Sequence, residues 1–127
     1  MKKLIIILLV FAEPFLLKGQ SSKVFDHLTM KSSILKSERK YAIYLPPGYE
    51  TSQRSYPVLY LLHGSGDNET SWIQFGEVQH ITNKAITDGS CTPMIIVTPD
   101  ADTEVRGYVN SAKGDWRYED FFFKEFI

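Results

Sequence analysis

The segment of this chain that is best suited to chemistry is a glycine-punctuated turn that follows an apolar run. Residues 58–62 are apolar at every position, a pattern typical of a strand buried on both faces of a parallel sheet. The next residues, His63-Gly64-Ser65-Gly66, allow the backbone to turn tightly where a side chain would block it. Such a loop is suited to pointing backbone N–H groups at a developing oxyanion. The pattern therefore indicates half of a hydrolytic site.

Length and charge narrow the class of protein. The chain has 127 residues, enough for one small domain but fewer than most sheet-based hydrolases need. Its 14 basic and 15 acidic residues nearly balance, and they form no basic stripe for nucleic acid and no polybasic helix for a membrane surface. The single Cys91 has no internal partner for a disulfide, so we expect a packed or loop thiol.

The amino terminus has the layout of a secretory signal peptide. Lys2 and Lys3 precede the apolar residues 4–12, and a polar shift follows at residues 18–22. The alternative is a buried amino-terminal helix, but the basic start and the abrupt polar change favour export. We predict a signal peptide over residues 1–20, a secreted or periplasmic protein, and no membrane association once the leader is cleaved.

The rest of the chain alternates between strand and helix patterns. Strands are predicted over residues 24–31, 39–45 and 94–98, and apolar residues at helical spacing predict a helix over residues 76–88. The strand over residues 58–62, the helix over residues 76–88 and the strand over residues 94–98 form a βαβ unit, so we predict an α/β fold with a mostly parallel sheet. The polar loop over residues 101–114 follows the last strand, where α/β folds place their sites.

A final helix is predicted from Asp115, which is a candidate N-cap. Phe122 and Phe126 lie four residues apart, as do Phe123 and Ile127, so at least one broad face of this helix is apolar. Because the chain stops without a helix terminator, we expect the last element to be cut within its length.

Several motifs, in order, resemble the esterase D-like branch of the α/β-hydrolases, which includes feruloyl and acetyl-xylan esterases of carbohydrate esterase family one. The resemblance covers residues 21–127 and implies the amino-terminal part of an α/β-hydrolase domain, truncated before the strand that carries the nucleophile. The motifs are Tyr44-Leu45-Pro46-Pro47-Gly48-Tyr49, Tyr56 to Gly64, Trp72, Pro99-Asp100, and Trp116-Arg117-Tyr118-Glu119-Asp120-Phe121.

In such enzymes a serine in a Gly-x-Ser-x-Gly elbow attacks the ester, a histidine moves its proton, and an acid orients the histidine. This sequence contains no Gly-x-Ser-x-Gly. The resemblance therefore implies only the oxyanion loop, with Gly64 shaping the turn and Ser65 offering its backbone N–H. A merely structural turn is the alternative, and a nucleophilic Ser65 is disfavoured because no base is placed beside it. His63 is expected to be structural, bonding neighbouring loops.

The resemblance also implies substrate-side residues in the loops. We predict that Trp116 stacks on a sugar or an aromatic acyl group, with Asn110 hydrogen-bonding beside it, and that Asp67 and Trp72 also line the substrate site. The alternative for both tryptophans is packing in the core.

No cofactor or metal site is predicted. Asp100, Asp102 and Glu104 alternate as in a calcium loop, but Val105 stands where the sharp-turn glycine would be needed. A solvated acidic loop is the simpler interpretation. The scattered histidines do not suggest a metal site either.

Two functions remain. The first is a secreted serine carboxylic-ester hydrolase that removes feruloyl or acetyl groups from plant polysaccharide such as xylan, present here without its Ser-Asp-His triad. Its partners would be an acylated polysaccharide or small ester and the missing carboxyl-terminal half of the same protein. The second is a non-catalytic carbohydrate-binding or accessory domain derived from that fold. It is disfavoured because residues 58–62 would form an exposed apolar edge. We expect the isolated chain to fold poorly and to lack esterase turnover.

Overall fold

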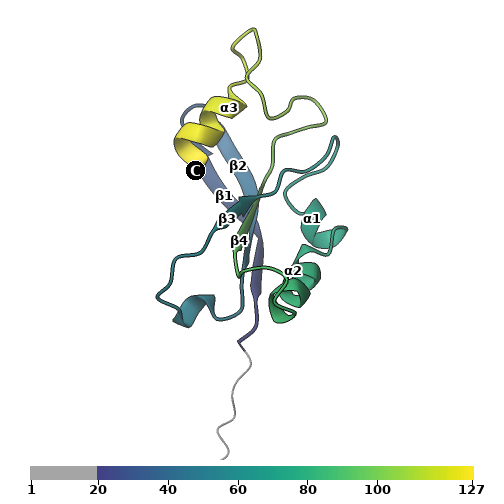
Figure 1. Cartoon of the computed structure of the whole chain (residues 1–127). Coiled ribbons are helices and arrows are strands. Elements are labelled where there is room, and N and C mark those ends of the chain that lie inside the picture. Colours follow the sequence, from purple (N-terminus) through teal and green to yellow (C-terminus); the bar gives the residue numbers. More distant parts are fainter. Residues whose placement is uncertain (1–19) are drawn as a thin grey trace, which may run out of the picture.

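The structure, a computed structural model, describes residues 20–127 and consists of a four-stranded sheet with helices on both sides (Figure 1). Apart from Gln20, the predicted signal peptide over residues 1–20 lies outside the described residues. Within the described part of the chain, no helix is long and apolar enough to cross a membrane.

The strand order in the sheet is β1-β2-β4-β3. Strands β1 (Lys23–Ser32) and β2 (Ser37–Leu45) form an antiparallel hairpin whose register shifts between Phe25 and Leu28. Strand β4 (Ile95–Pro99) pairs antiparallel with β2 and parallel with the short β3 (Val58–Tyr60). The described sheet is therefore mixed, and its parallel part is the predicted βαβ unit.

Helices α1 (Ser71–Gln74) and α2 (Val78–Thr87) cover one face of the sheet (Figure 1). Val78 of α2 packs with Tyr44 and Ile96 in one buried cluster. The single turn η1 (Tyr49–Thr51) follows β2 after Pro46-Pro47-Gly48, and Gly48 has a φ of 80°. The strands and α2 were thus predicted within a few residues of their observed bounds.

The carboxyl-terminal helix lies on the other face and departs from the expected start. It consists of α3 (Tyr118–Phe121) and a π-helical turn, η2 (Phe122–Phe126). Asp115 is not its N-cap, because the Asp115 carboxylate accepts the Ser111 hydroxyl and helical geometry starts only after Arg117. Phe122 and Phe126 stack as expected, with ring centroids 5.8 Å apart.

Part of the apolar surface is uncovered. Residues 58–62 were expected to be buried on both faces, but β3 is an edge strand and Val58 and Leu59 are 44% and 43% exposed. Phe123 and Ile127 are also exposed. The reason is positional: β3 pairs with β4 on one side, and among the described residues nothing pairs with its other side.

Candidate active site

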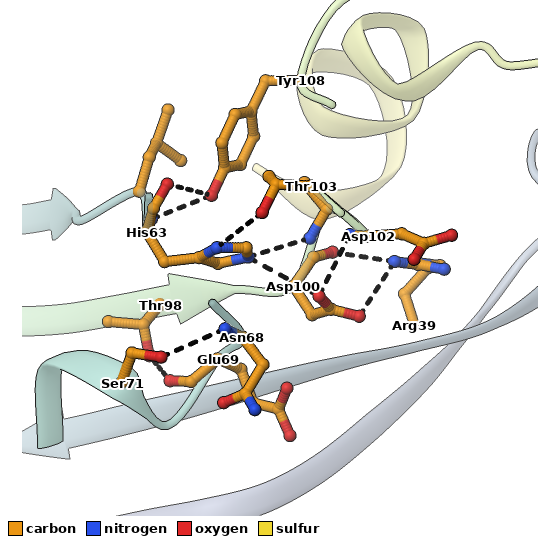
Figure 2. Close-up of polar contacts among 12 residues, drawn as sticks. Arg39, His63, Asn68, Glu69, Ser71, Thr98, Asp100, Asp102, Thr103 and Tyr108 are labelled. Atoms are coloured by element: carbon orange, nitrogen blue, oxygen red, sulfur yellow. Dashed lines mark hydrogen bonds and ion pairs between the residues drawn. The ribbon is translucent and has the colours of Figure 1, made fainter. Parts of the chain in front are cut away.

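Strand directions bring three segments to one edge of the sheet. Because β3 and β4 are parallel, the loops that follow them, residues 61–70 and 100–117, start side by side. Strand β2 runs the other way, so its beginning lies at the same edge, where the Asp100 N–H donates to the carbonyl of Lys40. Figure 2 shows side chains from all three segments converging there.

The predicted oxyanion turn is a type II β-turn. The Asp67 N–H donates to the Gly64 carbonyl across 3.3 Å, and Gly66 has a φ of 77°. Ser65 has negative φ, so the turn has the backbone that places glycine at its third position. Gly64 and Ser65 are exposed, and no hydrogen bond within residues 20–127 occupies the Ser65 N–H. That amide is free to bind a ligand oxygen.

His63 is buried beneath this turn and bonds on both sides of its ring. Its Nε2 accepts the Ala101 N–H at 3.2 Å, so the proton sits on Nδ1, which donates to the Gly64 carbonyl at 2.9 Å. The expectation that His63 bonds neighbouring loops is confirmed by these contacts. Its side chain is fully buried, so it lies out of contact with solvent.

Asp100 joins the loop after β4 to the start of β2. The Arg39 Nη2 donates to the Asp100 carboxylate at 3.1 Å and to its carbonyl at 3.0 Å. The Asp102 N–H donates to the other carboxylate oxygen, Oδ1, which lies 3.5 Å from His63 Nε2. The pair is largely buried, with the Arg39 and Asp100 side chains 11% and 20% exposed. Asp100 therefore belongs to a buried polar network and not to a solvated acidic loop.

Removing the Asp100 carboxylate is expected to destabilise the protein strongly. Asp100→Ala leaves the Arg39 charge buried and unpaired, which typically costs about 3–5 kcal/mol of unfolding free energy. The measurement is urea unfolding of the protein encoded by the whole reading frame that includes this chain, followed by far-ultraviolet circular dichroism. The matched control is Asp88→Ala, which removes an exposed ion pair with Lys84 and is expected to cost about 0.5 kcal/mol or less. Equal losses in the two variants would contradict a buried role for the Arg39–Asp100 pair.

Two tyrosines complete the network, Tyr118 buried and Tyr108 half-buried. The Tyr108 hydroxyl accepts the His63 N–H at 2.8 Å and donates to the His63 carbonyl at 3.1 Å. The Tyr118 hydroxyl donates to the Asp100 carbonyl at 3.0 Å. Burial raises the pKa of Tyr108 to about 12 and raises that of Tyr118 further. Both phenols therefore stay protonated at neutral pH and keep their donor protons.

These tyrosines predict a loss of stability in strong alkali. Burial also raises the pKa of Tyr44 to about 12, and an unfolded tyrosine titrates near pH 10. A raised folded-state pKa means that the contribution is fully present below pH 10 and is lost as pH rises toward 12. Urea midpoints measured from pH 9 to 12 should fall above pH 10, and less steeply in Tyr108→Phe than in Tyr49→Phe, which changes an exposed phenol. Equal slopes in both variants would contradict the assignment.

The structure places the predicted substrate residues around the two loops. The Trp116 N–H donates to the Gly107 carbonyl at 2.6 Å, and the Arg39 and Arg106 guanidinium groups lie 5.3 and 4.7 Å from its ring centroid. The exposed Asn110 accepts the Asp120 N–H. Trp116 is thus engaged by the protein itself, and its contact with substrate stays a prediction, as does that of Asn110.

Trp72 and Asp67 lie on the side of the oxyanion turn. The Trp72 N–H donates to the Leu62 carbonyl at 2.9 Å, which ties α1 to the end of the apolar run. A Cβ on Gly64 would lie 3.2 Å from the Asp67 carboxylate, so this exposed acid sits against the turn. Both residues border the expected site, and their role in binding substrate stays a prediction.

Sequence reasoning missed Arg39, Tyr108 and Thr103 as site residues; the Thr103 hydroxyl donates to the Gly64 carbonyl at 2.7 Å. Arg39 was predicted to lie in a strand, but nothing in the sequence around it indicates that its side chain is buried. Tyr108 lies in a loop that was otherwise interpreted as polar and irregular. An aromatic side chain in such a loop is a signal that the loop packs against the rest of the protein. Among the described residues no three histidine, cysteine, aspartate or glutamate side chains form a metal-binding group.

Comparison with protein families and curated proteins places the chain among esterases. A family model described as "Putative esterase" matches residues 32–125. An endo-1,4-beta-xylanase/feruloyl esterase of Xylanibacter ruminicola is 48% identical over 59 residues, which cover 43% of this chain and 8% of that protein. Endo-1,4-beta-xylanase Y of Acetivibrio thermocellus is 41% identical over 58 residues, which cover 45% of this chain and 5% of that protein.

Solved structures show the same likeness. A ferulic acid esterase superposes with a TM-score of 0.79 and 36% identity, covering 85% of this chain and 43% of that one. A CE1 ferulic acid esterase of Anaeromyces mucronatus in complex with ferulic acid gives a TM-score of 0.64 and 26% identity, covering 90% and 43%. The predicted α/β-hydrolase class is confirmed by these structures, and the chain spans less than half the length of each relative.

Proposed function

Because this chain belongs to the "Putative esterase" family, we propose that it forms the amino-terminal part of a secreted or periplasmic serine ester hydrolase. The proposed substrates are feruloyl or acetyl esters of plant polysaccharide. The ferulic acid esterase that is 36% identical supports this choice, as does the Xylanibacter ruminicola relative, whose name joins xylanase with feruloyl esterase. The observation that carries the proposal is the unoccupied Ser65 amide, in a turn at the carboxyl end of a parallel strand.

The proposed chemistry is acyl transfer through a serine outside this chain. The serine Oγ bonds to the ester carbonyl carbon while its proton passes to a histidine, and the carbonyl oxygen becomes an oxyanion. The Ser65 N–H, with the amide that follows the nucleophile, would hydrogen-bond that oxyanion. Collapse releases the sugar hydroxyl, which takes the proton from the histidine, and water then cleaves the acyl-enzyme to a carboxylic acid.

The exposed apolar surface favours this proposal over an accessory domain. Val58 and Leu59 on the edge of the sheet, and Phe123 and Ile127 on the terminal helix, would be an aggregation hazard in a protein that ends in this state. A further strand and helix of the same polypeptide would cover them.

The experiment that tests this function uses the protein encoded by the whole reading frame that includes this chain. Purified protein is assayed on methyl ferulate, para-nitrophenyl acetate and feruloylated xylan, and we expect hydrolysis with release of the free acid. A reading frame that closes at Ile127, or a folded full-length protein that hydrolyses none of these esters, would refute the proposal. Retention on a xylan affinity gel without hydrolysis would favour the accessory domain.

The oxyanion role of Ser65 has a sharper test. Ser65→Pro removes the backbone N–H, and proline is favoured at the second position of a type II turn, so the fold should tolerate it. Losing one oxyanion donor should lower kcat by about 10²–10³-fold. Ser65→Ala keeps the amide and loses only the long hydrogen bond from the hydroxyl to the Thr103 carbonyl, 3.5 Å, so kcat should stay within about twofold of the parent. Equal kcat values for the proline and alanine variants would contradict the assignment.

A further inference from the structure

The loop after β4 reaches the oxyanion loop with two hydroxyl groups. In Figure 2 the Tyr108 hydroxyl bonds the His63 main chain, and the Thr103 hydroxyl lies beside the His63 ring. The Thr103 hydroxyl donates to the Gly64 carbonyl at 2.7 Å, and the Tyr108 hydroxyl brackets the His63 main chain. We propose that Thr103 and Tyr108 are positioning residues: Thr103 directs the Ser65 N–H at the oxyanion, and Tyr108 fixes the peptide that precedes it. This inference rests on the proposed esterase function and adds to it the residues that set the direction of the hole.

The Gly64 carbonyl is held by three donors. Besides Thr103 Oγ1, it accepts His63 Nδ1 at 2.9 Å and the Asp67 N–H at 3.3 Å. A carbonyl oxygen has two lone pairs, so three donors saturate it and leave its direction little freedom. One donor comes from the turn itself, one from the buried imidazole, and one from the opposite loop.

Because the peptide bond is planar and trans, fixing the direction of the Gly64 carbonyl also fixes the direction of the Ser65 N–H. In such a peptide the C=O of one residue and the N–H of the next lie in one plane and point in opposite directions. Fixing the Gly64 carbonyl toward Thr103 and His63 therefore fixes the Ser65 N–H away from them. That N–H has no hydrogen-bond partner within residues 20–127.

Tyr108 applies the same constraint one peptide earlier. Its hydroxyl donates to the His63 carbonyl at 3.1 Å, and this fixes the Gly64 N–H in the opposite direction. It also accepts the His63 N–H at 2.8 Å, so one oxygen holds both main-chain groups of a single residue. A phenol does both only when it is protonated, as a tyrosine is at neutral pH, and partial burial raises the pKa of Tyr108 to about 12.

The two hydroxyls are themselves held by the buried network. Ala101 donates its N–H to the His63 ring, and Asp100 before it is fixed by Arg39 and Tyr118. Thr103 lies two residues beyond Ala101, so its hydroxyl is presented from an anchored segment. The directions of the main-chain N–H groups in the oxyanion loop are thus set by the loop after β4 as well as by the glycines of the oxyanion loop itself.

The test measures steady-state kinetics of the full-length protein on methyl ferulate. Thr103→Val replaces the hydroxyl with a methyl group of similar size, and Tyr108→Phe removes only the phenolic oxygen. Because a misaimed donor weakens binding of the transition state and not of the ground state, we expect kcat to fall about 10- to 100-fold while KM changes less than about twofold. Thr103→Ser, which restores the hydroxyl, should recover most of the loss.

The controls remove similar hydroxyls far from the site. Thr87→Val deletes a hydroxyl that donates to the Asn83 carbonyl, and Tyr44→Phe deletes a buried phenol that donates to the Asn83 side chain. Both should leave kcat unchanged. Unchanged kcat in Thr103→Val and Tyr108→Phe would overturn the inference, and so would loss of folding in both, because their hydroxyls would then be structural. A parent protein without activity would refute the proposed function instead.

Discussion

The candidate active site, where the loops after β3 and β4 meet the start of β2, depends on the buried ion pair between Arg39 and Asp100. Asp100 follows the last residue of β4, and its carboxylate and carbonyl both accept Arg39 Nη2 from β2. Its carbonyl also accepts the Tyr118 hydroxyl, and its Oδ1 accepts the Asp102 N–H. A single residue therefore fastens the loop after β4 to the sheet and to the terminal helix. Such a pair is costly to desolvate and tolerable only because nearly every polar atom of Asp100 is bonded.

That anchoring explains why two irregular loops can form a defined surface. Loops are usually the mobile parts of an α/β domain, yet an oxyanion site needs donors held in place before the charge develops. Here His63 is buried, its ring bonds Ala101 on one side and Gly64 on the other, and its main chain is held by Tyr108. Hydrogen bonds in a dry environment are stronger than those in water, so the loops stiffen each other. The parallel pairing of β3 with β4 is what brings them within reach.

The sequence predicts the sheet and its central turn well because their signals are local. The apolar run predicts a strand from its own residues, and the following His63-Gly64-Ser65-Gly66 predicts a turn. The observed type II turn has glycine at the position where its backbone requires a positive φ. Arg39, Thr103 and Tyr108 were not predicted because each bonds a residue far away in the sequence, at separations of 39 to 61 residues that the strand order sets. Asp115 misled for a related reason: it suits an N-cap, but a nearby serine hydroxyl binds it first.

The exposed edge of β3 connects the fold to the proposed chemistry. An uninterrupted apolar run such as residues 58–62 is typical of an interior strand of a sheet. Within residues 20–127, however, β3 is an edge strand, and Val58 and Leu59 are exposed. In a parallel sheet a new strand beside β3 would end at the same edge as the Ser65 amide. A nucleophile carried at the end of that strand would then lie next to the donor that must receive the oxyanion. The unpaired apolar side of β3 would favour aggregation if it stayed exposed. Pairing of that side with a further strand would bring the nucleophile close to the Ser65 amide.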